Sequence, residues 1–183
     1  MRIENTPIEG LVIIHPTLFN DDRGYFYEKF NEARFAELYG QSVHFVQDNQ
    51  AKSCKNVLRG LHFQKGEHAQ AKLVSVISGI VLDVAVDLRK GSSTFGKSHA
   101  ILLSAENKLQ FFVPRGFAHG YAVLSDEAEF FYKCDNYYNK AAEGGIIYNC
   151  PQLNIDWKID LTDAIVSEKD QILPTLEEYI QTN

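Results

Sequence analysis

The sequence is poor in the residues that build disulfide frameworks and metal centres. It has only three cysteines, Cys54, Cys134 and Cys150, an odd number without the spacing of a metal site. We therefore expect free thiols and a cytoplasmic location. The N-terminus, MRIENTPIEG, lacks the apolar core of a secretory signal, and no apolar run is long enough to span a bilayer. No membrane partner is expected.

Long basic runs are absent as well. The chain has 18 Lys and Arg against 24 Asp and Glu, which gives a formal net charge of −6. Because nucleic-acid binding needs a basic stripe, no nucleic-acid partner is expected. A small nucleotide-linked ligand needs only a few local cations, and this composition remains compatible with one.

Short strand patterns dominate what is present. Hydrophobic residues make up 45% of the chain, with 12 Phe and 9 Tyr, which favours β structure. Strands are expected at residues 11–15, 25–30, 43–53, 57–64, 72–77, 80–88, 100–103, 109–113, 117–124 and 129–134. Ser78 and Gly79 predict a hairpin turn between two of them.

Helical signals are few and lie near the ends of the chain. Asn31 can cap a helix over residues 32–39, with Gly40 in the stop position. Residues 167–180 are expected to form two short helices broken at Pro174. The whole pattern predicts one all-β domain over residues 1–183. We expect a jelly-roll barrel or double sheet with a few short peripheral helices.

Residues 57–72, VLRGLHFQKGEHAQAK, place Arg59, His62 and Lys72 within one short apolar frame. An apolar strand rarely accepts two cations and an imidazole unless something pairs them. One interpretation is an imidazole base flanked by cations that hold an anion or stabilise developing negative charge. The alternative is a histidine bonded to a backbone carbonyl, with both cations extended into solvent.

A second histidine, His119, follows a turn in residues 114–120, PRGFAHG. This pattern has the form of the second motif of cupin barrels. Metal-binding cupins take further ligands from a first motif, but here Gln64 stands at the second histidine position and Lys72 at the glutamate position. Because an ammonium group repels a cation and cannot ligate it, we expect no metal and no other cofactor.

Aromatic and charged residues elsewhere in the chain are further candidates for the site. The segment EFFYKCDNYY, residues 129–138, places Tyr132 in an aromatic strand and Tyr138 at its exit, and a tyrosine that faces a cavity can act as a general acid. Ordinary core packing is the alternative for both. By residue type alone, Arg23, Glu28 and Glu143 pass for solvated surface charges, and Asp170 for a carboxylate at a helix N-terminus.

Together these motifs identify a resemblance that covers nearly the whole chain. The sequence resembles the dTDP-4-dehydrorhamnose 3,5-epimerase family, and the block Arg-Gly-Leu-His-Phe-Gln is specific to that family. The resembling segments are residues 22–24 with Glu28, 45–49, 56–64, 82–87, 114–120, 129–133, 143–144 and 167–170.

The resemblance implies a homodimeric, cofactor-free isomerase acting on dTDP-4-dehydro-6-deoxy-D-glucose in dTDP-L-rhamnose synthesis. It implies that His62 is the base, paired with Asp170, and that Tyr132 is the acid. Lys72 would stabilise the enolate oxygen and Tyr138 would stack on the thymine. The remaining expected substrate-binding residues are Arg23, Glu28, Gln47, Asp48, Asn49, Arg59, His119, Glu143 and Lys169.

Three other functions remain open on the sequence alone. The first is an epimerase that acts on one carbon only, or on a related nucleotide-linked 4-keto sugar. The second is a metal-dependent cupin enzyme, which Gln64 and Lys72 argue against. The third is a sugar-nucleotide binding module without catalysis, which the presence of base and acid candidates argues against.

Overall fold

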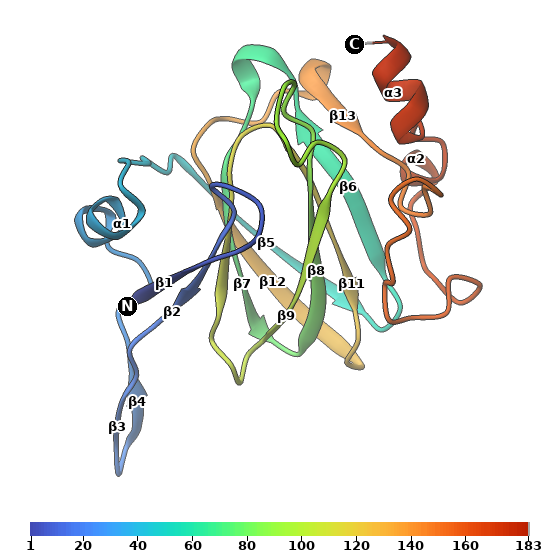
Figure 1. The fold of residues 1–183 in the computed structure, drawn as a ribbon. Coiled ribbons are helices and arrows are strands. Elements are labelled where there is room, and N and C mark those ends of the chain that lie inside the picture. The colour runs from blue at the N-terminus through green and yellow to red at the C-terminus, as the bar shows by residue number, and fades with distance from the viewer. Residues whose placement is uncertain (183) are drawn as a thin grey trace.

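A computed structural model describes residues 1–182, and its centre consists of two antiparallel sheets facing each other (Figure 1). The six-stranded sheet contains, in spatial order, β1 (Arg2–Asn5), β2 (Val12–His15), β10 (Gln110–Val113), β7 (Lys72–Ser78), β12 (Glu127–Cys134) and β5 (Gln47–Cys54). The five-stranded sheet contains β13 (Glu143–Gly145), β6 (Leu58–Gln64), β11 (Phe117–Val123), β8 (Ile80–Asp87) and β9 (Ser98–Ser104). The predicted all-β, cupin-like class is confirmed.

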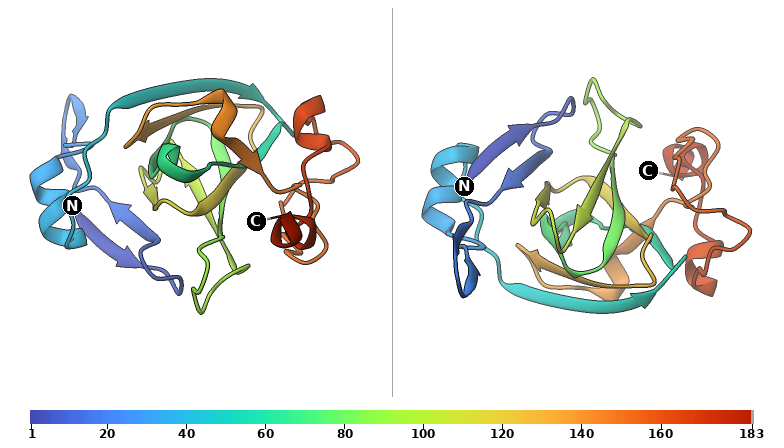
Figure 2. Two further views of the ribbon diagram at one scale, coloured as in Figure 1. Left: turned by 90° about the horizontal axis from the view of Figure 1, so that it is seen from above. Right: turned by 90° about the horizontal axis from the view of Figure 1, so that it is seen from below.

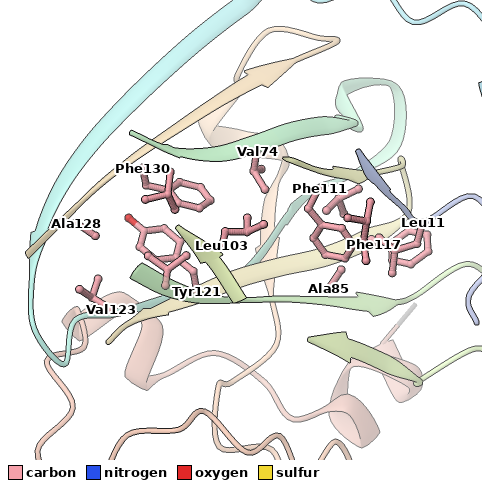
Figure 3. Close-up of a cluster of buried hydrophobic side chains, with 14 of the residues drawn as sticks. Leu11, Val74, Ala85, Leu103, Phe111, Phe117, Tyr121, Val123, Ala128 and Phe130 are labelled. Atoms are coloured by element: carbon pink, nitrogen blue, oxygen red, sulfur yellow. The ribbon is translucent and has the colours of Figure 1, made fainter. Parts of the chain in front are cut away.

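The space between the sheets is filled by large apolar side chains from both (Figure 3). Both faces of β8 and β11 are buried, which explains why these strands are mostly apolar instead of alternating between apolar and polar residues. This inner core closes one part of the barrel and leaves the other part for a cavity. Its members include Leu11, Val74, Leu103, Phe111, Phe117, Tyr121 and Phe130.

Two further apolar layers cover the outer faces of the sheets. Helix α1 (Glu32–Tyr39) places Phe35 fully buried against the six-stranded sheet, which stabilises the fold by about 1.5–3 kcal/mol. The C-terminal segment covers the five-stranded sheet, where Trp157 is buried and donates to the carbonyl oxygen of Tyr148 at 2.8 Å. Figure 2 shows α1 and the C-terminal helices on opposite sides of the barrel.

The helix predictions are confirmed with their capping residues. The side chain of Asn31 accepts from the amide of Arg34, and Gly40 ends α1 in the left-handed conformation. Near the C-terminus, α2 (Glu168–Gln171) and α3 (Leu176–Thr182) flank Pro174. Two single-turn helices, η1 (Gly66–His68) and η2 (Lys140–Ala142), lie in loops. Among residues 1–182, no helix is long and apolar enough to cross a membrane.

The predicted hairpin at Ser78 and Gly79 is wrong. Strand β7 pairs with β10 and β12, whereas β8 pairs with β9 and β11, so the turn passes the chain from one sheet to the other. Gly79 has a positive φ of 80°, and a Cβ there would collide with the carbonyl oxygen of Glu127. A two-residue turn has the same sequence signature whether it joins neighbours or switches sheets.

The predicted strand at 25–30 is mostly wrong, because only Gly24–Phe26 (β4) is extended and paired. It forms a small hairpin with β3 (Phe19–Asp21), which projects away from the barrel (Figure 1). Phe30 instead packs on Phe35 and Phe45 beneath α1. The edge strands β1 and β13 went unpredicted, because short edge strands carry few buried residues.

Candidate active site

A cavity of about 660 Å³ opens between the two sheets, and a smaller one of about 240 Å³ adjoins it. Four side chains line both cavities, so these residues mark the place where the two meet: His62, Lys72, Tyr132 and Glu143. His62 comes from the five-stranded sheet, while Lys72 and Tyr132 come from the six-stranded sheet. A ligand in the cavity would therefore meet the imidazole on one side and the amine and phenol on the other.

His62 is held by a buried carboxylate. Its Nε2 lies 2.7 Å from Oδ1 of Asp170, and Asp170 is only 2% exposed. The other carboxylate oxygen accepts the amide of Gly60 at 3.2 Å, while the hydroxyl of Ser167 accepts the amide of Asp170. The expected contact is thus present. It fixes the imidazole orientation and leaves the second ring nitrogen available as a base.

The charge of Asp170 follows from two opposing effects. Burial by itself raises the pKa of this carboxyl group, but the hydrogen bond and charge of His62 outweigh burial. The pKa of Asp170 is lowered as a result, with further help from the Gly60 amide. The group is a carboxylate at neutral pH and favours a proton on the nitrogen that it faces.

Replacing Asp170 by asparagine is expected to lower turnover about 10²–10³-fold while the protein stays folded. An amide keeps the size of the side chain but removes the charge that orients the imidazole and supports its basicity. Steady-state kinetics together with dTDP titration would measure this, because nucleotide affinity should change less than threefold. Turnover within twofold of wild type would remove Asp170 from the mechanism.

A second imidazole–carboxylate pair lies beside the first. His119 and His62 are partners across β11 and β6, and His119 Nε2 lies 2.9 Å from Oδ1 of Asp83. Both members are buried, with Asp83 fully inaccessible. His119 lines the large cavity. Asp83 was given no role by the sequence, although a carboxylate inside the apolar strand VLDVAVD was the available signal.

Lys72 sits at the junction of the cavities with its amino group unpaired. Among residues 1–182 its amino group makes no hydrogen bond or ion pair, and this nitrogen lies 6.0 Å from the centre of the Tyr132 ring. Burial lowers its pKa, and this effect is partly offset by Cys134, Asp83 and Glu143. An unpaired amine in this position is suited to meet an oxygen that gains negative charge.

Lys72→Met should abolish activity yet stabilise the fold by about 1 kcal/mol, or about 2–4 °C in Tm. The lowered pKa means that the unfolded chain binds more protons than the folded one between the two pKa values. The wild type should therefore gain stability as pH rises through that window, and the variant should not. Thermal unfolding across alkaline pH measures both effects, and a variant less stable than wild type would contradict them.

Tyr132 faces the cavity from β12. Its ring lies 6.0 Å from that of Phe130, and burial raises the pKa of its hydroxyl to about 12. Nearby Cys134 and Tyr121 add to this rise, and Arg59 opposes it. The hydroxyl is protonated at neutral pH and has no hydrogen-bond partner within the described part of the chain. It is therefore free to donate to a ligand.

Polar residues extend from this junction toward both ends of the cleft. Nε of Arg59 donates to Ser53 at 3.2 Å, its side chain also bonds to the hydroxyl of Tyr121, and the guanidinium lines the larger cavity, where it can meet an anion. Glu143 accepts from Tyr138 at 3.3 Å and also pairs with Lys169. Gln47 and Asn49 line the smaller cavity together with Tyr138. Seven of the expected binding residues therefore gather along one cleft with the catalytic candidates.

Three expected residues do not line either cavity. Arg23 lies at the tip of the β3–β4 hairpin, where its side chain is 90% exposed and pairs with Asp21. Glu28 pairs with Arg34 at 3.0 Å, and Asp48 pairs with Lys133 at 2.9 Å.

Several polar residues of the site had no role in the sequence interpretation. Ser53 bonds to Arg59 and lies 3.5 Å from the hydroxyl of Tyr121, and both are buried. Gln64, at the cupin ligand position, accepts the amide of Asn139. Across residues 1–182, His, Cys, Asp and Glu side chains form no group of three placed to hold a metal ion.

The two-sheet barrel and its acid–base cleft are those of a cupin-like isomerase. A family profile described as dTDP-4-dehydrorhamnose 3,5-epimerase matches residues 5–178. The chain belongs to this family.

Individual relatives agree with the family assignment. The enzyme of that name from Escherichia coli (strain K12) is 52% identical over 181 residues, covering 99% of this chain and 97% of the relative. The crystal structure of the Elizabethkingia anophelis NUHP1 enzyme is 61% identical, with a TM-score of 0.95 and 97% coverage of both chains. A Legionella pneumophila Philadelphia 1 epimerase, solved with dTDP-4-keto-L-rhamnose, is 50% identical with a TM-score of 0.92, covering 96% of this chain and 93% of that one.

Proposed function

We propose that the protein inverts carbons 3 and 5 of dTDP-4-dehydro-6-deoxy-D-glucose to give dTDP-4-dehydro-L-rhamnose, within dTDP-L-rhamnose synthesis. Relatives of the same family at about half identity support the substrate and the reaction. The observation that carries the mechanism is the meeting of the His62–Asp170 pair and Tyr132, which face one cavity from opposite sheets.

The chemistry explains why these groups are needed. Both target hydrogens lie next to the carbon-4 ketone, so removing either one gives an enolate. The gap between such a C–H acid and an imidazole is roughly a dozen pK units, or about 16 kcal/mol. A base alone does not cross this gap at a useful rate. A preorganised donor contributes about 3–4 kcal/mol, and Lys72 with His119 supplies donors beside the site.

Inversion also requires that the proton return from the opposite face. His62 removes the proton from one side, with Asp170 stabilising the imidazolium that forms. Tyr132 then delivers its hydroxyl proton to the same carbon from the other sheet. The resulting tyrosinate and imidazolium exchange protons with water before the next cycle. No electron transfer occurs in either step, and each proton removed from the sugar is replaced by one proton from Tyr132.

The nucleotide is held by the cationic and amide groups along the cleft. Arg59 presents its terminal nitrogens to the diphosphate, and Lys169 adds a second cation paired with Glu143. Tyr138, half exposed beside Gln47, stacks on the thymine. Asn49 adds a side-chain amide near the sugar. Asp48 contributes to binding only through its neighbours, because it points away toward Lys133.

Product analysis tests the proposed reaction. The purified protein is incubated with dTDP-4-dehydro-6-deoxy-D-glucose, and proton coupling constants of the product are read by NMR. Inversion at both carbons is expected. Inversion at carbon 3 only would support a single-carbon epimerase instead, and an unchanged sugar with bound dTDP would support a binding module.

The projecting β3–β4 hairpin supports a homodimer in which each hairpin reaches the cleft of the other subunit. Its aromatic residues Phe19 and Phe26 are 61% and 70% exposed, which is unusual for a free surface. Arg23 sits at its tip with Glu28 just beyond. In such a dimer both residues would join the substrate site across the subunit boundary.

Subunit complementation tests this arrangement. His62→Ala and Arg23→Ala chains are coexpressed with different tags, and the mixed dimer is purified. If Arg23 acts across the interface, one of the two sites in the mixed dimer is intact, so activity should recover to about half of wild type. If Arg23 acts within its own chain, the mixed dimer should show no more than the mean of its nearly inactive parents. An Arg23→Ala homodimer as active as wild type would show that Arg23 has no role.

A further inference from the structure

The loop between β12 and η2 carries Tyr138 and is held by hydrogen bonds to two glutamine side chains from opposite sheets. Gln47 of β5 accepts the backbone amide of Tyr138 at 3.1 Å. Gln64 of β6 accepts the next amide, that of Asn139, at 3.0 Å. Two consecutive amides are therefore fixed by side chains that reach the loop from the two sides of the barrel.

Gln64 differs from Gln47 in its burial and in its position within the cupin motif. It occupies the position where metal-binding cupins have a second histidine ligand, and it is only 8% exposed. Its carbonyl oxygen is directed to the Asn139 amide, and it lines the smaller cavity. Without that acceptor, the amide would lose its hydrogen bond in a half-buried position, a change that favours local rearrangement.

We infer that Gln64 is a positioning residue that sets the ring of Tyr138 for stacking on the nucleotide base. This inference rests on the proposed function, in which Tyr138 contacts the thymine. Tyr138 itself is 52% exposed, so little packing holds its ring, and its orientation depends on the backbone bonds together with the bond from its hydroxyl to Glu143. The position that supplies a histidine ligand in metal-binding cupins here supplies a glutamine that holds a binding loop.

Other bonds hold the rest of the loop and keep the effect local. Gln70 donates to the carbonyl oxygen of Asn136 at 2.7 Å, and Asn136 donates to that of Glu67. Asn139 caps η2 through its own side chain and contacts His68. Loss of the Gln64 bond should therefore shift Tyr138 and Asn139 while the fold remains intact.

The test uses the full-length protein with Gln64→Met, which keeps side-chain length but removes the acceptor. Affinity for dTDP should fall about 5–10-fold by calorimetry, equal to about 1.0–1.4 kcal/mol, while kcat stays within about twofold. Amide exchange at Asn139 should accelerate. Gln64→Glu retains an acceptor and should keep that amide protected. The matched control is Gln50→Met, because Gln50 is an exposed residue of β5 whose side-chain amide donates to Glu129.

A double-mutant cycle separates positioning from general damage. In a Tyr138→Ala background, Gln64→Met should weaken dTDP binding less than twofold, because the ring on which it acts is gone. Fully additive losses, or wild-type affinity in Gln64→Met, would overturn the inference. If the wild-type protein itself fails to bind dTDP, the proposed function fails first and the inference with it, so the two failures are distinguishable.

Discussion

His62→Ala is expected to reduce epimerisation by at least about 10³-fold, because the proposed mechanism assigns proton removal to this imidazole. His119 forms the same kind of pair with the buried Asp83, but it is only 6% exposed and lines only the larger cavity, whereas His62 lines both cavities together with Tyr132. Exchange of solvent deuterium into the sugar, followed by NMR, measures proton removal directly. Affinity for dTDP should change less than threefold, since the residues proposed to bind the nucleotide are other side chains of the cleft.

His44→Ala is the matched control for this substitution. His44 is an exposed imidazole beside Glu32, far from the cavity lining, and its loss should leave exchange unchanged. Wild-type turnover in His62→Ala would sink the assignment of the base. Loss of dTDP binding in parallel with turnover would show instead that the substitution damages the site as a whole.

Tyr132→Phe is expected to lower net epimerisation about 10²–10³-fold while proton removal persists. Phenylalanine preserves the ring packing against Phe130 but removes the proton donor. His62 can then only return a proton to the face from which it came. Deuterium should therefore enter the substrate with retained configuration, and exchange should exceed inversion by a large ratio.

The exposed Tyr137 offers a control at the end of the same segment, and Tyr137→Phe should match wild type. Equal loss of exchange and inversion in Tyr132→Phe would point to a role in substrate placement. Unchanged inversion would show that Tyr132 is not the acid and would favour a water molecule as the proton donor.

The sequence predicted the strands well where burial dictated the pattern. Residues 80–88 and 117–124 read as strands because both faces of β8 and β11 are covered, one by the inner core and the other by the C-terminal segment. Sheet membership was not predictable in the same way. The Ser78–Gly79 turn was interpreted as a hairpin because turn chemistry is local, whereas pairing depends on strands far away in sequence.

The site was predicted to the extent that single segments carry it. Arg59, His62 and Lys72 lie within fourteen residues and form a recognisable motif. The contact of His62 with Asp170 spans 108 residues, and only the family resemblance indicated it. Asp83 and Ser53 escaped notice because each is an ordinary polar residue until the fold shows its partner, and Gln64 was noticed only as a missing metal ligand, since its bond to Asn139 depends on the fold.

The placement of Arg23 and Glu28 shows another limit of sequence motifs. A motif states which residues serve a site but not which chain supplies them. The hairpin that carries Arg23 projects away from the barrel (Figure 1), and Arg23 lines neither cavity of its own chain.

Deuterium incorporation into dTDP-4-dehydro-6-deoxy-D-glucose by the wild-type protein, in deuterated water with a metal chelator, tests the central claim most directly. The account predicts deuterium at both carbon 3 and carbon 5, with inversion at each and no loss of rate from chelation. Absence of exchange at both carbons, with the nucleotide sugar bound, would contradict it.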